Sequence, residues 1–347
     1  MKATVFRSSG RFAVEDKPVP GPGIGEAIVK VTLTTIGGSD IHIVKGEYPV
    51  RSGLTIGHEA VGVIHELGDG VYDYEPGQRV LIGAITPCGQ CEACLSGHTA
   101  QCGGQRGGWR LGNTIDGCQA EYVRIPYAQA NLAPIPDSLS DEQVILLSAV
   151  ASTGFAAAES GPVKLGDYVA VFGQGPIGLC ATLGAHLMGA ARVFAVDRNP
   201  FRLEVARRFG ATDTLLAVPE SLETILTATH HTGVDVAIEA LGIQDTFSNA
   251  LAILKPGGTL SSVGVYSRSI SVDVASFGDG LAEKTITTSL CPGGKERMLR
   301  LLRLVESKRI DLTPLLTHHF PLENIVEAYD LCSQQRDNVL KVAVHVR

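Results

Sequence analysis

A glycine-rich turn at residues 173–178 constrains this chain more than any other feature. Its residues, Gly-Gln-Gly-Pro-Ile-Gly, fit the spacing G-x-G-x-x-G, follow the apolar run YVAVF and precede a helix-like segment. Asp197 ends the next apolar run, 19 residues after Gly178. A strand, this turn, a helix and a second strand ending in an acidic residue are what a dinucleotide-binding βαβ unit requires. The four elements together favour a bound dinucleotide over a glycine turn that holds no ligand.

Each residue of the turn has a physical role in that interpretation. We expect Gly173 to make the turn, Gly175 to let backbone N–H groups approach the pyrophosphate, and Gly178 to allow close packing of helix on sheet. The start of the helix, at Pro176 and Ile177, then faces the phosphates.

Asp197 also bears on which dinucleotide binds. A carboxylate at this position accepts hydrogen bonds from the ribose hydroxyls and repels a 2′-phosphate. Arg198 and Arg202 lie nearby in the sequence, and either could pair with a phosphate. The carboxylate nevertheless favours NAD(H) over NADP(H).

The whole chain has 347 residues, about twice the usual domain length. Its two parts differ in their sequence patterns. The first 150 residues contain short β-branched or alternating runs, separated by glycine- and proline-containing turns, which is typical of a small all-β domain, a barrel. From Gly166 onward, apolar strands alternate with helical segments and predict a parallel, doubly wound sheet. The fold class is therefore α/β with two domains.

Charge and hydropathy exclude several partners. The formal net charge of −7 argues against nucleic acid or an anionic membrane. No apolar run reaches the roughly 18 residues of a membrane helix, and the N-terminal residues MKATVFRSSG lack the apolar core of a signal peptide. We expect a cytoplasmic protein that acts on a small-molecule substrate.

Four of the eight cysteines are clustered within fifteen residues, at Cys88, Cys91, Cys94 and Cys102. Disulfides do not persist in the cytosol, so this cluster indicates a metal site. Four thiolates in one loop suit tetrahedral zinc in a closed site that fixes the loop and does no chemistry. An iron–sulfur cluster, which four thiolates also suit, is the second alternative. The expected content is one structural zinc per chain.

These two sites, in this order, resemble the zinc-type medium-chain alcohol dehydrogenases over essentially the full length. The motifs that carry the resemblance are residues 37–42 (GGSDIH), 57–62 (GHEAVG), the four-cysteine loop and the glycine-rich turn; residues 107–109, 116–117 and 291–294 resemble the bacterial secondary-alcohol dehydrogenase branch. The resemblance implies a GroES-like β-barrel catalytic domain at 1–150 and 290–347, a Rossmann domain at 151–289, and a homotetramer. Further candidates for cofactor contact are Thr153, Val263, Gly264 and Val265.

The expected ligands of a catalytic zinc depart from the family pattern. In the family a cysteine, the histidine of G-H-E and a later acidic residue or cysteine hold that metal, but this chain has Gly37 and Ala149 at the first and third positions. His58 remains, with Glu59 as an occasional extra ligand. A catalytic zinc needs three protein ligands and an open position. We therefore predict that the catalytic zinc is absent.

Hydride transfer itself requires the nicotinamide, whereas a metal-free site must stabilise the developing oxyanion with hydrogen-bond donors. The candidates are Ser39 and His42 at the family's proton-relay positions, a protonated His58, and Tyr48, which resembles a tyrosine of zinc-free quinone and enoyl reductases. The leading hypothesis is an NAD(H)-dependent oxidoreductase that acts on a small alcohol or carbonyl compound. The alternatives are reduction of an activated C=C bond, a non-redox NAD-binding protein, and an NAD-using lyase or epimerase.

Overall fold

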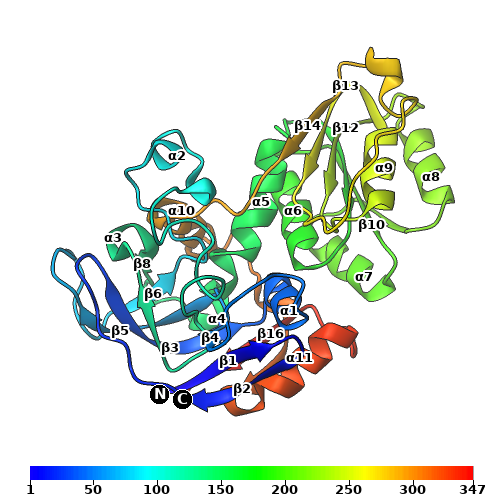
Figure 1. The fold of residues 1–347 in the computed structure, drawn as a ribbon. Coiled ribbons are helices and arrows are strands. Elements are labelled where there is room, and N and C mark those ends of the chain that lie inside the picture. Colours follow the sequence, from blue (N-terminus) through cyan, green and yellow to red (C-terminus); the bar gives the residue numbers. More distant parts are fainter. Residues whose placement is uncertain (347) are drawn as a thin grey trace. The chain divides into compact units, whose positions relative to one another are not determined.

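The computed structural model describes residues 1–346, which divide into two compact units. One unit comprises Met1–Ser152 and the chain from Cys291 onward, and the other comprises Thr153–Leu290. In Figure 1 the first unit runs from blue through cyan to green and ends in orange and red, whereas the second runs from green to orange.

The second unit is built on one six-stranded sheet. Its strands are β9 (Tyr168–Phe172), β10 (Arg192–Asp197), β11 (Asp213–Leu216), β12 (Val234–Glu239), β13 (Leu254–Ser262) and β14 (Thr285–Thr288). The spatial order is β11-β10-β9-β12-β13-β14, and all neighbours are parallel. Counted from β9 this is the order 3-2-1-4-5-6, which confirms the doubly wound dinucleotide-binding sheet.

Helices cover both faces of this sheet because the side chains of each strand alternate. The helices are α6 (Pro176–Leu187), α7 (Pro200–Arg208), α8 (Glu220–Ala228) and α9 (Gln244–Ala252), and α5 (Val150–Ser160) precedes them. A 3₁₀ turn at Gly278–Gly280 lies between β13 and β14. On β9, Val169 and Val171 belong to an apolar cluster that includes Ala181 of α6. Phe172 belongs to a second cluster, with Phe247 of α9.

The first unit contains two sheets. A three-stranded sheet has the order β2 (Arg11–Asp16), β1 (Lys2–Ser8), β4 (Leu54–Thr55). The larger sheet has the order β15 (Leu316–Pro321), β16 (Lys341–His345), β3 (Ala27–Thr35), β5 (Ala60–Leu67), β6 (Arg79–Ile82), β8 (Leu132–Pro134), with β7 (Tyr122–Ile125) also paired to β3. Strands from the two ends of the chain therefore lie in one sheet.

The prediction of an all-β domain is wrong in one respect, because helices also belong to this unit. They are α1 (Gly38–Val44), α2 (Glu92–Leu95), α3 (Ala128–Asn131), α4 (Asp141–Val144), α10 (Lys295–Glu306) and α11 (Ile325–Gln334), with 3₁₀ turns at Thr99–Gln101, Ile145–Leu147, Thr313–Leu315 and Leu322–Asn324. Helix α11 packs Ile325, Ala328 and Tyr329 into the same core as the barrel strands. Helix α1 and the segments that follow it carry the candidate catalytic residues.

Within residues 1–346, no single helix is long and apolar enough to cross a membrane. The segments Asp141–Leu147 and Val150–Ser160 meet that test only when taken together across a 43° bend, by length and composition alone.

Candidate functional site

The glycine-rich turn has the geometry that a close backbone approach requires. Gly173 has φ +88°, a left-handed conformation that favours glycine. A β-carbon at Gly178 would lie 1.7 Å from the carbonyl oxygen of Gly173, so this position excludes any side chain. A β-carbon at Gly175 would meet no atom within 4 Å, which leaves open space at the start of α6. The turn can therefore receive a pyrophosphate at a helix N-terminus.

Asp197 lies buried at the end of β10, where it is fixed by backbone donors. The N–H groups of Gln174 (2.6 Å) and Asn199 (2.8 Å) each donate to one of its carboxylate oxygens. A guanidinium nitrogen of Arg202 lies 4.0 Å away, and its Nε is buried without a hydrogen-bond partner among the described residues. Each oxygen keeps further acceptor capacity, so the carboxylate can receive a ribose diol.

The other candidate cofactor residues lie on neighbouring segments of the same unit. Residues 263–265 follow directly after β13, and a β-carbon at Gly264 would lie 2.2 Å from the backbone nitrogen of Gly242. Thr153 is half-buried on α5, and Arg198 follows Asp197 directly. Their roles in binding stay predictions.

The four clustered cysteines converge in space. One sulfur each from Cys88, Cys91, Cys94 and Cys102 lies within 4.8 Å of all the others, and the Cys91 and Cys102 sulfurs are 3.8 Å apart. Two sulfurs 2.3 Å from a tetrahedral zinc are about 3.8 Å apart, so the set fits a structural zinc. Backbone N–H groups of Cys94 and Gly103 lower the pKa of Cys91 to about 6, which favours the ligating thiolate.

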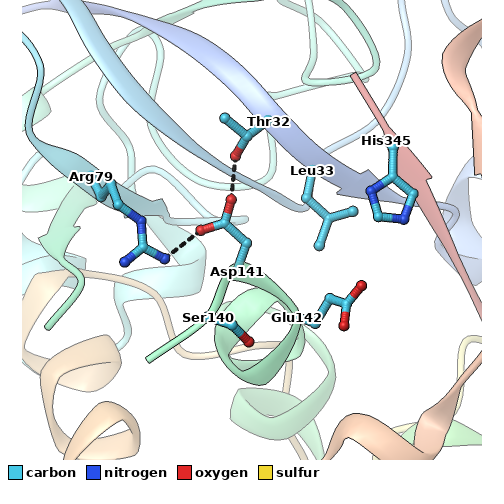
Figure 2. A pocket seen from close by; sticks show the side chains of 7 residues that line it. All are labelled: Thr32, Leu33, Arg79, Ser140, Asp141, Glu142 and His345. Atoms are coloured by element: carbon cyan, nitrogen blue, oxygen red, sulfur yellow. Dashed lines mark hydrogen bonds and ion pairs between the residues drawn. The ribbon is translucent and has the colours of Figure 1, made fainter. Parts of the chain in front are cut away.

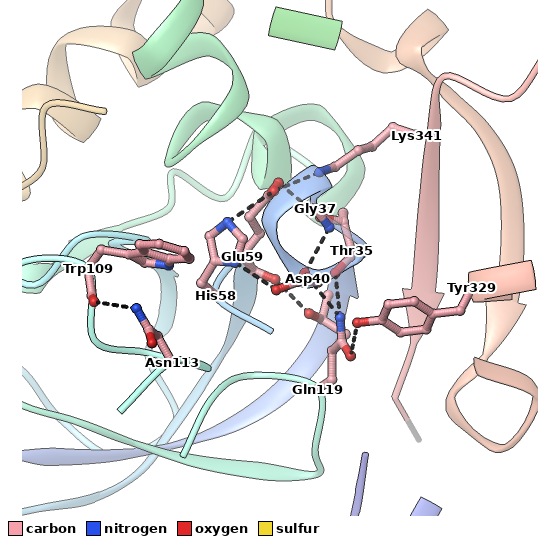
Figure 3. Close-up of polar contacts among 11 residues, drawn as sticks. Thr35, Gly37, Asp40, His58, Glu59, Trp109, Asn113, Gln119, Tyr329 and Lys341 are labelled. Atoms are coloured by element: carbon pink, nitrogen blue, oxygen red, sulfur yellow. Dashed lines mark hydrogen bonds and ion pairs between the residues drawn. The ribbon is translucent and has the colours of Figure 1, made fainter. Parts of the chain in front are cut away.

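The surroundings of Gly37 form the second group of functional candidates (Figure 3). His58 directs Nδ1 to the Asp40 carboxylate at 3.0 Å, and Asp40 also accepts the backbone N–H of Gly37 at 2.8 Å. A β-carbon at position 37 would lie 2.7 Å from Cε1 and 3.2 Å from Nε2 of His58. Position 37 therefore faces the imidazole directly.

Charge decides the protonation state of this histidine. Burial alone would lower the pKa of His58, but the charge of Asp40 and its hydrogen bond outweigh that effect, and the pKa lies above its ordinary value of 6.5. Because the carboxylate can only accept, Nδ1 is the donor in this pair. When the ring is protonated, Nε2 carries the additional proton.

Glu59 is buried and both of its carboxylate oxygens are engaged. Oε1 accepts from Nζ of Lys341 at 2.6 Å, and Oε2 accepts from the hydroxyl of Thr35 at 2.9 Å. Oε1 also lies 3.7 Å from Nε2 of His58. Lys341 comes from β16, 282 residues along the chain. This buried ion pair was not anticipated, although a single lysine in the apolar run VLKVAVHV is a visible signal.

A polar chain continues the network behind Asp40. Gln119 donates to the carbonyl of Thr35 at 3.1 Å and to Asp40 at 3.4 Å, and the buried Tyr329 hydroxyl donates to Gln119 at 3.0 Å. Gln119 and Tyr329 are ordinary polar residues in sequence, and no motif marks them. They hold Asp40 in place against His58.

The remaining candidates lie on and beyond α1. Tyr48 is partly buried between His42 (ring centroids 5.5 Å apart) and Trp109 (5.4 Å, edge-to-face). His42 also contacts the carboxylate of Glu47. Ser39 and His42 are three residues apart on α1, the spacing of one helix face. Burial raises the pKa of Tyr48, which keeps its hydroxyl protonated.

Comparisons with known proteins agree with this architecture. The alcohol dehydrogenase GroES-like domain matches residues 23–137, and the zinc-binding dehydrogenase domain matches residues 176–307. An alcohol dehydrogenase of Cupriavidus necator is 52% identical over 99% of this chain and 98% of its own. An NADP-dependent isopropanol dehydrogenase of Thermoanaerobacter brockii is 38% identical over 99% of both chains. The zinc-dependent alcohol dehydrogenase 2 structure from Streptococcus pneumonia has a TM-score of 0.93 at 36% identity, covering 100% of this chain and 98% of that one.

The chain belongs to the zinc-type medium-chain alcohol dehydrogenase superfamily. It is an enzyme of that class, with a GroES-like unit and a Rossmann-type unit.

Proposed function

We propose that this enzyme transfers hydride between NAD(H) and a small alcohol or carbonyl compound without a catalytic zinc. In this proposal residues 151–289 bind the nucleotide, and residues 1–150 with 290–347 hold the catalytic groups. The observation that carries the proposal is the environment of Gly37: this residue offers no ligand atom, and its position faces the imidazole of His58.

The donors near His58 do not fit a zinc. Gly37 and Ala149 offer no side-chain ligand, so two of the three expected protein ligands are missing. Glu59 contacts Lys341, whose positive charge already stands beside the carboxylate and would repel a bound cation. Cys118 is buried near Asp40 and Glu59, and burial followed by those two charges raises its pKa, which disfavours the thiolate. One nitrogen, Nε2 of His58, is left as a ligand.

His58 can stabilise the reacting oxygen in place of a metal. When bound, reduced nicotinamide supplies the hydride that adds to the carbonyl carbon. The imidazolium Nε2–H of His58 donates to the carbonyl oxygen as negative charge develops there, and then transfers its proton to give the alcohol. In the oxidation direction the neutral Nε2 takes up the hydroxyl proton. Asp40 holds the ring and stabilises the imidazolium throughout.

The aromatic group and the relay residues complete the proposed site. Tyr48 and Trp109 supply an apolar wall with a protonated hydroxyl, which suits a small substrate. Ser39 and His42 pass protons toward solvent, since the His42 side chain is 42% exposed.

The cofactor preference rests on Asp197. The T. brockii relative is NADP-dependent. In this chain, however, a buried carboxylate stands at the end of β10 and would repel a 2′-phosphate. We infer that NADH is the preferred reductant.

The test combines metal content with turnover. The purified enzyme is treated with a mild chelator, its zinc is measured by elemental analysis, and NADH consumption is followed with aldehydes, ketones and enones. We expect one zinc per chain and carbonyl reduction that survives chelation. Two tightly bound zincs, or activity lost with one of them, would refute zinc-free catalysis. Turnover of enones alone would favour C=C reduction, and tight NADH binding without turnover would favour a non-redox protein.

A gain-of-metal variant sharpens this test. Gly37 has φ −87° and ψ 159°, an extended conformation that cysteine adopts, so the obstacle to a cysteine is the His58 ring. Gly37→Cys with Ala149→Asp should restore two donors and add a second zinc of modest affinity. Each single substitution is the matched control and should add none. If a single variant or the parent holds a second zinc, other residues have rebuilt the site.

We also propose a homotetramer and a cytoplasmic location. The exposed edge strand β14 gives a second copy an open row of backbone groups to pair with. Cys88, Cys91, Cys94 and Cys102 are thiols and not disulfides, which a reducing compartment favours. Light scattering on the purified protein tests the assembly.

A further inference from the structure

An open surface pocket of about 410 Å³ lies against α4 in the first unit (Figure 2). We propose that one side of this pocket is a divalent transition-metal site formed by Glu142, His319 and His345. One donor atom from each of these residues lies within 4.8 Å of the other two. The proposal is independent of the enzyme's reaction.

Strand register brings the two histidines together. In the parallel pair β15–β16, His319 is opposite Ala343, and His345 follows Ala343 by two residues. Because side chains alternate along a strand, His319 and His345 lie on the same face of the sheet. Their rings stack at 5.3 Å, and Nδ1 of His319 lies 3.0 Å from Nε2 of His345.

Helix α4 carries the third donor in a fixed position. Ser140 and Gln143 form a capping box at its start. Asp141 is tied to Arg79 at 2.6 Å and to Thr32 at 2.5 Å. Figure 2 shows this anchored aspartate on one side of the pocket, with Glu142 and His345 on the other. The Glu142 carboxylate lies 3.8 Å from Nδ1 of His319.

The donor set matches zinc chemistry. Two imidazoles and one carboxylate are a known three-ligand set for zinc that leaves a position open. Two ligand atoms about 2.0–2.1 Å from a tetrahedral zinc are about 3.3 Å apart, close to the 3.0 and 3.8 Å separations here. Arg79, the cation of the pocket, is neutralised by Asp141, so it does not oppose a bound cation.

The two imidazoles turn a ring nitrogen toward each other, Nδ1 of His319 and Nε2 of His345, at 3.0 Å. A neutral imidazole is the form that ligates a metal. The three donors come from β15, β16 and α4. A bound ion would therefore connect the two C-terminal strands to that helix. Metal binding should therefore raise the melting temperature.

The experiment titrates the full-length protein, already loaded with zinc in the cysteine loop, with Zn²⁺ alone by calorimetry and with Co²⁺ by visible absorption. We expect one additional equivalent, a Co²⁺ spectrum without thiolate charge-transfer bands, and a higher melting temperature with Zn²⁺. His345→Gln and His319→Asn should each weaken this binding by tenfold or more and abolish the thermal shift. Glu142→Gln should weaken it less.

His318→Ala is the matched control, because this histidine is on the same strand but faces the other way and should leave binding unchanged. NADH binding, measured by fluorescence, shows that each variant is folded. The proposal is overturned if the parent binds no additional equivalent, or if both histidine variants, folded by this measure, bind Zn²⁺ as tightly as the parent and His318→Ala.

Discussion

Two parts of the first unit contain metal-type donors, and they use them in opposite ways. In the cysteine loop four sulfurs converge within 4.8 Å, and backbone N–H groups are their main protein contacts. Around Gly37 the carboxylates already have partners within the chain: Asp40 contacts His58, and Glu59 accepts from Lys341 and Thr35. The first arrangement fits a bound cation, whereas in the second a lysine of the chain already stands beside the glutamate.

A ligand motif therefore has to be judged by what its donors contact. The G-H-E motif is intact in the sequence, yet its glutamate is paired with a lysine of the chain. A buried carboxylate needs such compensation whether a metal or a lysine supplies it. In this chain Lys341 supplies the positive charge beside Glu59.

Loss of a ligand from the cysteine loop should change the stability of the protein most. Cys94→Ser removes one of four ligands and should lose the zinc, because binding free energy at such a site is also folding free energy. We expect a fall in melting temperature on the order of 10 °C, measured by calorimetry alongside elemental analysis. Cys332→Ser, outside the loop, should keep both the zinc and the stability. A zinc-free Cys94→Ser protein as stable as the parent would contradict a structural role.

The next prediction tests the buried ion pair between Lys341 and Glu59. Lys341→Met leaves the Glu59 carboxylate buried without its cation and should lower the free energy of unfolding by about 3–5 kcal/mol, measured by urea denaturation. Adding Glu59→Gln removes the uncompensated charge and should recover most of the loss. Equal destabilisation in the single and double variants would show that the ion pair does not balance this site.

The sequence was sufficient for the features that depend on local spacing. The glycine turn, Asp197 and the four cysteines are each defined within about 25 residues, and their geometry follows from turn conformation and ligand chemistry. The doubly wound sheet followed from alternating strands and helices. The helices within the first 150 residues were missed because short segments such as α1 and α4 have no periodic pattern long enough to detect.

The contacts that decide the chemistry of His58 were beyond sequence reasoning. Lys341 reaches Glu59 only because β16 joins the sheet beside β3, and Tyr329 reaches Gln119 across 210 residues. The backbone conformation at Gly37 could not be predicted from the sequence either, since glycine permits conformations that cysteine avoids. Its extended φ and ψ show that space, and not the backbone, opposes a side chain there.

Asp197, beside the glycine-rich turn, is a third carboxylate to compare, because its hydrogen bonds come from backbone N–H groups. Its two backbone contacts leave acceptor capacity for a ribose, and removing its charge should relieve repulsion of a 2′-phosphate. Asp197→Ser should narrow the preference for NADH over NADPH ten- to a hundredfold, about 1.4–2.8 kcal/mol, in kcat/KM for the two cofactors. Glu220→Ser, at the exposed start of α8, should leave the ratio unchanged. A parent enzyme that prefers NADPH would refute this role of Asp197.

The smallest effect tests how Asp40 acts on His58. The raised pKa of His58 means that its protonated form is favoured in the folded enzyme above pH 6.5, so carbonyl reduction should fall as pH rises through the folded pKa. The stability that the charged pair contributes should be fully present below pH 6.5 and lost over the same rise. Asp40→Asn removes the charge and should move the alkaline limb of kcat for reduction down by about one pH unit. Glu66→Gln, a charge change at an exposed position on β5, should not move it. If the alkaline limb of kcat stayed in place in Asp40→Asn, and this variant still unfolded cooperatively, His58 would not be the proton donor. The contacts around Gly37 would then have no role in the reaction.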